Sequence, residues 1–303
     1  MLSHLISIDD LSKEDILSLL ALASRVEATP RRELFRRLEG TILATLFFEP
    51  STRTRLSFET AMARLGGRTV GFSEAAASST AKGESFSDTI RTVSRYADAI
   101  ALRHPLEGTA RRAAEVSRIP VVNGGDGANQ HPTQTLLDLF TLQKCFGKLE
   151  GLAIAIAGDL KYSRTVHSLL KALARFDGIK VRLVSPKSLR LAEGLARGLQ
   201  TEETESLAEG MRGADVLYMT RIQRERFPDP LEYEKVKNVY RLDAAMLKDM
   251  PDTFRVLHPL PRVSEIAPDV DDTPFAAYFD QAENGVIMRE AIFLKLLAPD
   301  FAS

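Results

Sequence analysis

Residues 51–55 combine hydroxyl and guanidinium side chains, a set that binds anions. Hydroxyl groups are short hydrogen-bond donors, and guanidinium groups are planar forks that match the oxygens of phosphates and carboxylates. Together they could hold a phosphorylated substrate without the glycines of a P-loop. The structural alternative is that the serine only caps a helix and the arginines lie in solvent. The residues are Ser51, Thr52, Arg53, Thr54 and Arg55.

This cluster lies at a predicted junction between a strand and a helix. Residues 41–48 form an apolar run typical of a buried strand, and apolar residues recur at helical spacing from 56 to 65. The N–H groups of the first helical turn have no partner within the helix, and the positive end of the helix dipole favours an anion. The sequence therefore predicts an anion site at the start of this helix.

Short apolar strands alternate with helical segments along the chain, which indicates an α/β fold. We expect two doubly wound parallel-sheet domains joined by interdomain helices, with ligands bound beyond the carboxyl ends of the strands. The first domain is expected over 1–146, with a closing helix at 285–303 packing back on it, and the second over 147–284. Further strands are expected at 69–72, 98–102, 119–122, 152–157, 179–184, 216–219 and 254–257. Further helices are expected at 86–96, 109–116, 132–146, 165–176 and 285–297. A polar stretch that ends at Leu207 is also expected to be helical.

Composition narrows the function classes. In 303 residues, 40 Lys and Arg balance 41 Asp and Glu, so the formal charge of −1 gives no broad field for nucleic acid or an anionic membrane. Cys145 is the single cysteine, which excludes an internal disulfide framework or a cysteine-based zinc cluster. No run reaches membrane-spanning length and 1–10 lacks a signal-peptide pattern, so a cytoplasmic protein is expected.

Common catalytic and nucleotide motifs have little support. The segment with Gly125 and Gly127 follows a predicted strand, but Gln130 stands where a dinucleotide fingerprint needs its third glycine. The sequence has no Gly-x-Ser-x-Gly, no Walker loop and no His-Glu-x-x-His. We therefore expect neither a resident metal nor a cofactor.

The order of residues from Phe48 to Thr54, with Glu49 between them, resembles the carbamoyl-phosphate signature of the aspartate/ornithine carbamoyltransferase family. Further stretches of the chain fit the same family, and together they span most of it. They are 76–84, 101–105, 131–134, 161–167, 218–223 and 258–262.

The resemblance implies roles for residues of the first domain. The phosphate would be held by four side chains, the carbonyl oxygen by three, and the carbamoyl amide by Gln134. Ser78 and Lys82 belong to a loop that, in the family, reaches into a neighbouring subunit's site, so a homotrimer with shared active sites is implied. As alternatives, that loop is an exposed surface loop and His131 is a helix cap or a packed ring. The phosphate set is Ser51, Thr52, Arg53 and Lys82, and the carbonyl set is Thr54, Arg103 and His131.

In the second domain, the resemblance assigns Arg164, Arg221 and Gln223 to the second substrate. Two guanidinium groups could neutralise two carboxylates, which suits a dicarboxylic amino acid such as L-aspartate. Pro259 and Leu260 would offer backbone carbonyls to the incoming amine. The alternatives are surface ion pairs for the two arginines, with Asp159 or Glu225, and a proline-rich turn that only shapes a loop.

Pro259 separates the two branches of the family. Ornithine carbamoyltransferases usually have a cysteine between the corresponding histidine and leucine, so Pro259 favours the aspartate branch, which supplies the committed step of de novo pyrimidine biosynthesis. Ornithine carbamoyl transfer and a non-catalytic anion-binding module remain the alternatives. Some members of the aspartate branch pair catalytic trimers with a separate zinc-carrying regulatory chain in an allosteric holoenzyme. By resemblance, state-dependent ion pairs there would use Glu49, Lys161, Glu225 and Glu232.

Overall fold

The computed structural model describes residues 2–73, 83–223, 227 and 229–302. The chain forms two compact units. Unit 1 contains Met1–Phe140 and Asn284–Ser303, and unit 2 contains Thr141–Glu283. The chain passes from one unit to the other within helices α6 (Pro132–Phe146) and α10 (Tyr278–Leu297). Each unit is an α/β domain built on a parallel sheet, as the sequence predicted.

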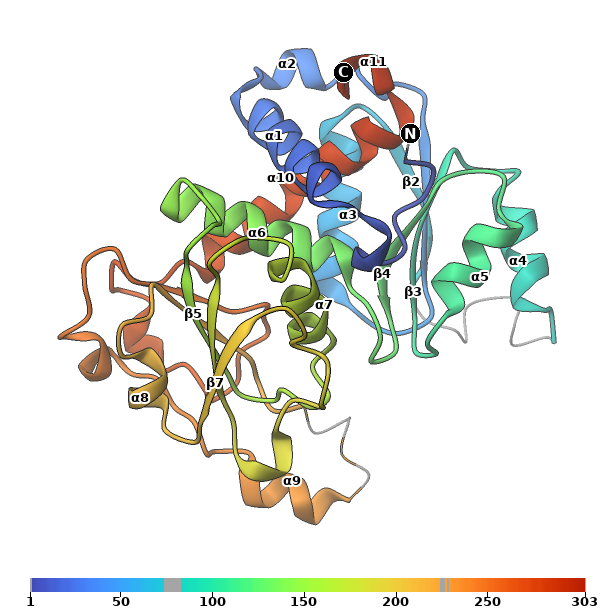
Figure 1. Cartoon of the computed structure of the whole chain (residues 1–303). Helices are drawn as coiled ribbons and strands as arrows, with labels where there is room; N and C mark the ends of the chain where they lie inside the picture. Colours follow the sequence, from blue (N-terminus) through green and yellow to red (C-terminus); the bar gives the residue numbers. More distant parts are fainter. Residues whose placement is uncertain (1, 74–82, 224–226, 228, 303) are drawn as a thin grey trace. The chain divides into compact units, whose positions relative to one another are not determined.

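Unit 1 is built on a four-stranded sheet in the order β2-β1-β3-β4, and every strand pair is parallel. The strand order reverses between β1 and β3, so this is the switch point where ligands of doubly wound sheets bind. Helices α4 and α5 lie on one side of this sheet, and α1 and α3 lie on the other (Figure 1). The strands are β1 (Ile42–Phe47), β2 (Arg68–Phe72), β3 (Ala99–His104) and β4 (Val121–Asp126). The helices are α1 (Lys13–Ala28), α2 (Arg31–Leu34), α3 (Thr52–Arg64), α4 (Phe86–Val93), α5 (Thr109–Val116) and α11 (Pro299–Ala302), with a 3-10 turn at Ile8–Asp10.

The central strands of unit 1 are apolar along their length because helices cover both faces. Five of the six residues of β1 are buried, and so are five of the six in β3. The helices begin where local capping chemistry predicts. In α1, Ser12 accepts from the backbone N–H of Asp15 at 3.1 Å, and Asp15 accepts from the backbone N–H of Ser12 at 3.0 Å. This capping box satisfies two backbone N–H groups at the start of α1.

Unit 2 is built on a five-stranded sheet in the order β7-β6-β5-β8-β9, again with every pair parallel. Its order reverses between β5 and β8. The strands are β5 (Ala153–Ala157), β6 (Lys180–Val184), β7 (Gln200–Thr204), β8 (Val216–Met219) and β9 (Arg255–Leu257). The helices are α7 (Arg164–Leu173), α8 (Leu207–Met211) and α9 (Pro230–Val236), with 3-10 turns at Lys187–Leu189, Ala244–Leu247 and Pro268–Val270.

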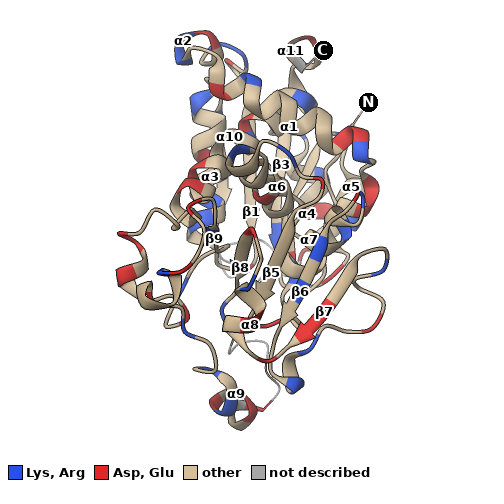
Figure 2. Ribbon diagram, turned by 60° about the vertical axis from the view of Figure 1, so that its left-hand side comes forward, with Lys and Arg blue, Asp and Glu red and all other residues tan. Residues whose placement is uncertain are grey.

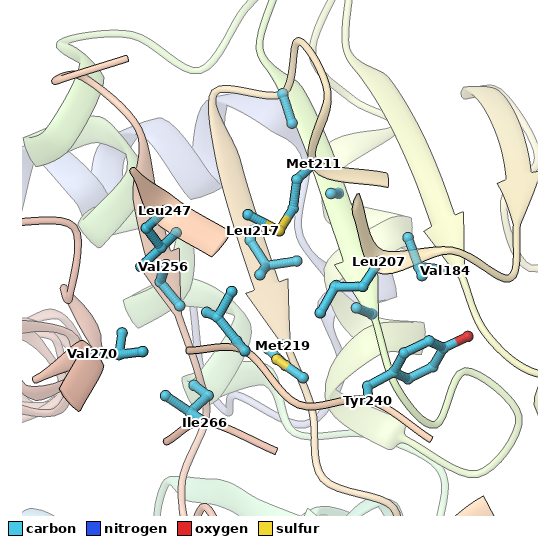
Figure 3. Close-up of a cluster of buried hydrophobic side chains, with 14 of the residues drawn as sticks. Val184, Leu207, Met211, Leu217, Met219, Tyr240, Leu247, Val256, Ile266 and Val270 are labelled. Carbon is cyan, nitrogen blue, oxygen red and sulfur yellow. The ribbon is translucent and has the colours of Figure 1, made fainter. Parts of the chain in front are cut away.

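One apolar cluster fills a face of the second sheet (Figure 3). Leu207 and Met211 from α8 pack there against Leu217 and Met219 of β8, and Val256 of β9 completes the layer. Leu217 and Met219 point to the same face because successive side chains of a strand alternate. This core fixes the ends of β5, β8 and β9, which carry the candidate site residues of unit 2.

The expected polar helical stretch before Leu207 is wrong, because Gln200–Thr204 forms strand β7. β7 pairs only with β6, and four of its five residues are exposed, so the strand shows no apolar alternation. Ion pairs between β7 and β6 stabilise this strand in place of apolar burial. Acidic residues of β7 lie beside basic residues of β6 (Figure 2), and Arg182 Nε lies 3.1 Å from Glu202 Oε2.

Several predicted boundaries also shift. Helix α3 begins at Thr52 rather than at 56, so part of the predicted anion cluster lies within its first turn. Strand β3 includes Arg103, and β4 runs from Val121 to Asp126 instead of ending at 122. Helix α10 begins at Tyr278, ahead of the predicted start at 285. Within the described ranges, no helix is long and apolar enough to cross a membrane.

Candidate active site

The β1–α3 junction positions the predicted anion cluster. Ser51 is the N-cap residue of α3, but its side chain makes no capping hydrogen bond. The alternative in which Ser51 serves as a side-chain cap is therefore wrong. Thr52 and Arg53 are exposed in the first turn of the helix. The N–H groups of such a turn attract anions, so the local backbone and the side chains favour the same ligand.

The two arginines of the cluster differ in their surroundings. Arg55 donates from Nε to Glu59 Oε1 at 2.7 Å, and Thr45 Oγ1 donates to the same oxygen at 3.1 Å. Arg55 is thus tied to a carboxylate of its own helix. Arg53 is the exposed member of the two and the better candidate for a ligand.

Arg103 lies beside this junction at the end of β3. Its backbone oxygen accepts from the N–H of Phe48 at 2.8 Å, which fastens the end of β1 to β3. The residue is 9% exposed, and its guanidinium donates from Nη1 to the Gly124 oxygen at 3.1 Å and has Nη2 3.3 Å from Glu49 Oε2. The switch point therefore holds a nearly buried positive charge next to the anion cluster.

Gly124 of β4 lies close to helix α3. A Cβ atom at Gly124 would stand 3.2 Å from Phe58 Cε2 and 3.6 Å from Thr54 Cγ2. The absence of a side chain thus lets β4 lie close to the first turns of α3. Gly124 thus lies beside Thr54 of α3 and accepts a hydrogen bond from Arg103 of β3.

His131 precedes α6, and its ring is 4% exposed. Its backbone oxygen accepts from the N–H groups of Gln134 at 3.0 Å and Thr135 at 3.2 Å. These two hydrogen bonds form the first turn of α6. Its ring nitrogen Nδ1 lies 3.5 Å from Thr133 Oγ1. Gln134 donates from Nε2 to Asp138 Oδ1 at 2.8 Å, which orients the amide along the helix.

Arg289, which lies in α10 of unit 1, was not predicted as a functional residue. Its guanidinium is 3% exposed, donates to Ser57 Oγ at 3.0 Å and to Thr133 Oγ1 at 3.1 Å, and lies 4.7 Å from the centre of the Phe58 ring. Burial lowers the pKa of Arg289 to about 10, and the Asp138 carboxylate opposes this shift. The signal that could have revealed it is a charged pair, Arg289 with Glu290, inside the otherwise apolar stretch 285–294.

Glu290 is the second buried charge of that helix. Its carboxylate is inaccessible to solvent and lies 2.6 Å from Arg31 Nη1 and 3.5 Å from Arg64 Nη1. Burial raises the pKa of Glu290, and the two arginines oppose the increase. These ion pairs fasten α10 to α2 and α3 within unit 1.

In unit 2, the switch point lies between the ends of β5 and β8. Thr220 Oγ1 accepts from the N–H of Asp159 at 3.2 Å and donates to the Ala157 oxygen at 3.2 Å. Gly158 has φ +120°, and a Cβ there would stand 2.2 Å from the Thr220 oxygen. Only glycine fits where the two strand ends approach so closely.

Arg164 and Arg221 follow these two strand ends. Arg164 is the first residue of α7 and is 8% exposed, so it does not lie at the surface as the alternative of a surface ion pair requires. Arg221 lines a cavity of about 310 Å³ together with Tyr233, Lys237 and Glu265. Of the remaining predicted residues for the second substrate, Gln223, Pro259 and Leu260 do not line this cavity, and neither does Arg164.

The 258–262 turn is held by hydrogen bonds at both ends. His258 accepts from the N–H of Leu260 through Nδ1 at 2.8 Å, so its Nε2 donates to Glu265 Oε1 at 2.8 Å. Burial lowers the pKa of His258 although Glu265 favours its protonation. Leu260 has φ +53°, an uncommon conformation for a residue with a side chain. Arg262 bonds Asp271 and Tyr278, which ties the far end of the turn to α10's first residue.

Comparison with known proteins decides the family. The carbamoyl-P binding domain of aspartate/ornithine carbamoyltransferases matches residues 3–144, and the Asp/Orn binding domain of the same enzymes matches residues 150–296. The chain belongs to the aspartate/ornithine carbamoyltransferase family. It is therefore a carbamoyltransferase, and the two matched segments account for nearly all of its length.

Individual aspartate carbamoyltransferases are similar over the whole chain. The catalytic subunit from Archaeoglobus fulgidus is 56% identical over 299 residues, which cover 98% of this chain and 100% of the relative. That from Thermococcus onnurineus is 54% identical over 293 residues, 95% of this chain and 94% of the relative. Among solved structures, the catalytic subunit of M. jannaschii aspartate transcarbamoylase aligns with a TM-score of 0.91, 51% identity and 99% coverage of both chains.

A carbamoyltransferase solved with its substrates is also similar. Aspartate transcarbamoylase from Trypanosoma cruzi, in complex with carbamoyl phosphate and aspartate, aligns with a TM-score of 0.89 and 39% identity over 97% of this chain and 95% of the relative. The two parallel-sheet domains are thus those of aspartate carbamoyltransferases.

Some residues that the family resemblance assigned lie outside the described part of this carbamoyltransferase. They are Ser78, Lys82 and Glu225. Of the other residues predicted to form state-dependent ion pairs, Glu49 lies 3.3 Å from Arg103, and Glu232 lies 2.5 Å from Lys235. Within the described residues, no cluster of three or more histidine, cysteine, aspartate or glutamate side chains is arranged to hold a metal ion.

Proposed function

We propose that this chain transfers the carbamoyl group of carbamoyl phosphate to L-aspartate, giving N-carbamoyl-L-aspartate and phosphate. The observation that carries the proposal is the 56% identity to an aspartate carbamoyltransferase catalytic subunit across 98% of the chain. Pro259 supports the aspartate branch over ornithine transfer, because it replaces the cysteine expected between His258 and Leu260 in the ornithine branch.

We assign carbamoyl phosphate to the domain over 1–146, together with the closing segment 285–303. Ser51, Thr52 and Arg53, with the first-turn amides of α3, bind the phosphate. Thr54, Arg103 and His131 donate hydrogen bonds to the carbonyl oxygen, and Gln134 binds the carbamoyl amide. Donors placed where charge develops lower the barrier, and loss of one such donor typically costs about a hundredfold or more in rate.

We assign L-aspartate to the domain over 147–284. The guanidinium groups of Arg164 and Arg221 neutralise its two carboxylates, and Gln223 binds beside them. The backbone oxygens of Pro259 and Leu260 accept from the attacking amine, because the 258–262 turn holds Leu260 at φ +53°. Ornithine carries a second amine in place of the side-chain carboxylate, so this pair of arginines disfavours it.

The reaction itself needs only these groups. The uncharged amine of aspartate attacks the carbonyl carbon, and the bond between that carbon and the phosphate oxygen breaks. A phosphate oxygen takes the proton that the amine loses, so atoms and charge balance without a change of oxidation state. The proposal therefore calls for no redox cofactor.

A direct assay tests the substrate assignment. The purified chain is supplied with carbamoyl phosphate and either L-aspartate or L-ornithine, and the product is identified by mass. Carbamoyl-aspartate alone is the expected result. Carbamoyl-ornithine would mean that Pro259 was misinterpreted. Phosphate binding in calorimetry without either product would favour a non-catalytic anion-binding module.

We further propose a homotrimer whose active sites are shared between neighbouring subunits, with Ser78 and Lys82 supplied in trans. Mixing two inactive variants tests this. Arg53→Ala and Lys82→Ala chains, unfolded together and reassembled, should recover about a quarter of the wild-type activity if each site takes the two residues from different subunits. Recovery of no activity from trimers of confirmed mixed composition would contradict sharing.

The name catalytic subunit, carried by the relatives, leads us to propose a separate zinc-carrying regulatory chain as a partner in an allosteric holoenzyme. Co-expression with a candidate chain, followed by mass measurement with and without a chelator, tests this. A complex that forms and then dissociates when zinc is removed would support the proposal. A catalytic chain of unchanged mass would contradict it for that candidate.

A further inference from the structure

Three side chains in unit 1 form a line that leads from a buried charge to the predicted catalytic histidine. Arg289 Nη2 donates to Thr133 Oγ1 at 3.1 Å, and Thr133 Oγ1 lies 3.5 Å from His131 Nδ1. All three residues are buried: Arg289 is 3% exposed, His131 is 4% exposed and Thr133 is inaccessible to solvent. Water therefore does not compete for these hydrogen bonds.

The chemistry of the groups fixes the direction of each hydrogen bond. A guanidinium has donors but no acceptor, so the oxygen of Thr133 must accept from Arg289. The single hydrogen of that hydroxyl then remains for donation, and His131 Nδ1 lies within reach of it. A neutral imidazole has one donor and one acceptor nitrogen, so an accepting Nδ1 leaves the hydrogen on Nε2.

We propose that Arg289 and Thr133 are positioning residues that hold His131 in the tautomer with its hydrogen on Nε2. The ring then presents a donor, which is what a histidine needs in order to polarise a carbonyl oxygen. In the other tautomer, Nε2 would be an acceptor and would repel that oxygen. The inference rests on the proposed function in so far as the carbonyl oxygen is that of carbamoyl phosphate.

The surroundings of Arg289 indicate why an arginine is buried here. Among the residues that the structure describes, no carboxylate lies within ion-pair distance of its guanidinium. Its partners are neutral: Ser57 Oγ, the Gly285 oxygen at 2.9 Å, Thr133 Oγ1 and the Phe58 ring. Burying a charge without a close counterion costs free energy. In exchange, Arg289 supplies a hydrogen-bond donor that is always protonated. Unlike a serine or a threonine, an arginine cannot reverse the bond and become the acceptor.

The network also fixes the place of the histidine. Ser57 and Phe58 belong to α3, Thr133 belongs to α6 and Arg289 belongs to α10, so one guanidinium joins three helices of unit 1. The helix that carries the phosphate-binding cluster and the segment that carries His131 are thereby held by the same group. A hydrogen bond to one ring nitrogen of a histidine determines which nitrogen carries the hydrogen.

Thr133→Val tests the proposal, because valine keeps the shape of threonine and removes only the hydroxyl. Thr135 provides a matched control. Its side chain is buried in the same helix, and its Oγ1 has no hydrogen-bond partner among the described residues. Thr135→Val should therefore leave both His131 and the activity unchanged. Thr133→Ser restores the hydroxyl and should rescue Thr133→Val.

The first measurement is the tautomer itself, from ¹⁵N resonances of the histidine rings in the full-length, ¹⁵N-histidine-labelled protein. The sequence contains five histidines, and His131→Gln identifies the resonances of His131. We expect a protonated Nε2 and a bare Nδ1 in the wild type, and a shift toward a mixture of tautomers in Thr133→Val. A wild-type ring with its hydrogen on Nδ1, or a Thr133→Val ring identical to the wild type, would overturn the proposal.

The second measurement separates kcat from KM. Thr133→Val should lower kcat about tenfold and change the KM for carbamoyl phosphate less than about twofold, because only the donor to the carbonyl is affected. An equal loss in Thr135→Val would mean that packing explains the effect, and would refute a positioning role. The tautomer measurement needs no substrate, so it stands even if carbamoyl transfer to aspartate fails.

Discussion

Arg103 and Gly124 lie on neighbouring parallel strands, and the guanidinium of Arg103 donates to the Gly124 oxygen at 3.1 Å. The contact fixes one edge of the guanidinium plane and leaves Nη2 directed toward Glu49, at 3.3 Å. Gly124 thus has two functions. It accepts the bond that orients Arg103, and its lack of a side chain lets Phe58 of α3 lie close to the same strand.

Gly124→Ala should therefore damage both the fold and the site. The added Cβ would stand 3.2 Å from Phe58 Cε2 and 3.3 Å from the Leu102 oxygen, and such overpacking costs about 1–3 kcal/mol. The displaced strand would also shift Arg103 relative to Thr54. We expect a lower melting temperature and weaker carbamoyl phosphate binding by calorimetry. A variant that keeps wild-type affinity would show that this contact does not set the site.

Arg53→Ala should abolish most of the activity without unfolding the protein. Arg53 is exposed, and we assign its guanidinium to the ligand, so its loss should lower kcat/KM by a factor on the order of a hundred or more. Arg55→Ala is the matched comparison. Arg55 is engaged by Glu59, and its removal should cost about tenfold or less. Steady-state kinetics and melting curves of both variants decide the matter; equal losses would contradict the assignment.

Arg221→Lys should affect aspartate selectively. Lysine keeps the positive charge, but its ammonium group cannot donate the two parallel hydrogen bonds that a guanidinium donates to a carboxylate. Each charge-assisted hydrogen bond is worth about 1.5–3 kcal/mol. We expect the KM for aspartate to rise about tenfold or more and the dissociation constant of carbamoyl phosphate to stay within about twofold. An equal weakening of both substrates would place Arg221 outside an aspartate-specific site.

His258 should make stability fall as the pH decreases. Burial lowers its pKa in the folded protein, so below the unfolded pKa of about 6.5 the unfolded chain binds more protons than the folded one. The contribution of neutral His258 is therefore complete above about pH 6.5 and is lost on acidification. His4 and His104, whose pKa values are also lowered by burial, act in the same direction.

Melting temperatures between pH 7.5 and pH 5 test this for His258. In His258→Gln, the amide can still bond the N–H of Leu260 and Glu265 but does not titrate. The decrease in melting temperature across this range should be smaller than in the wild type. An unchanged decrease would assign the pH dependence to other groups.

Arg31→Ala should destabilise the protein more at pH 8 than at pH 5. The substitution removes the closer partner of the inaccessible Glu290 and leaves the buried carboxylate with Arg64 as its partner. We expect the free energy of unfolding to fall by about 1–3 kcal/mol. Burial already raises the pKa of Glu290, and loss of Arg31 raises it further. The loss of stability is complete above the pKa of Glu290 in the folded protein. It is relieved as the pH falls through that pKa, because the carboxyl group then becomes neutral.

Glu290→Gln is the comparison for this pair. The side chains of Arg31 and Arg64 are 48% and 37% exposed, so they can be solvated when the carboxylate is removed. Glu290→Gln should therefore lose less stability than Arg31→Ala does at pH 8. Chemical denaturation at the two pH values measures both; a pH-independent loss in Arg31→Ala would contradict a titrating Glu290.

The sequence could predict the features that depend on local pattern. Apolar runs predicted the strands that precede Ser51–Thr54 and Arg221, and parallel strands place their carboxyl ends on one edge of a sheet. The strand orders, and with them the two switch points, came from the structure. Strand β7 was missed because its residues face solvent and form an edge, where charge pairs such as Arg182 with Glu202 replace apolar alternation. Arg289 was missed for a different reason. Its partners are far apart in sequence, and only folding brings Ser57, Thr133 and α10 together.

The division of unit 1 between the two ends of the sequence has a consequence for protein synthesis. The ring of Phe293 on α10 packs 6.0 Å from that of Phe58 on α3, but the ribosome makes all of unit 2 between them. The nascent unit 1 must therefore leave its α10-facing surface uncovered, open to chaperones, until α10 has been translated. A chain truncated before α10 would lack Arg289, Glu290 and Phe293 and could not complete this core. The core of the phosphate-binding unit can therefore be completed only after all of unit 2 has been translated.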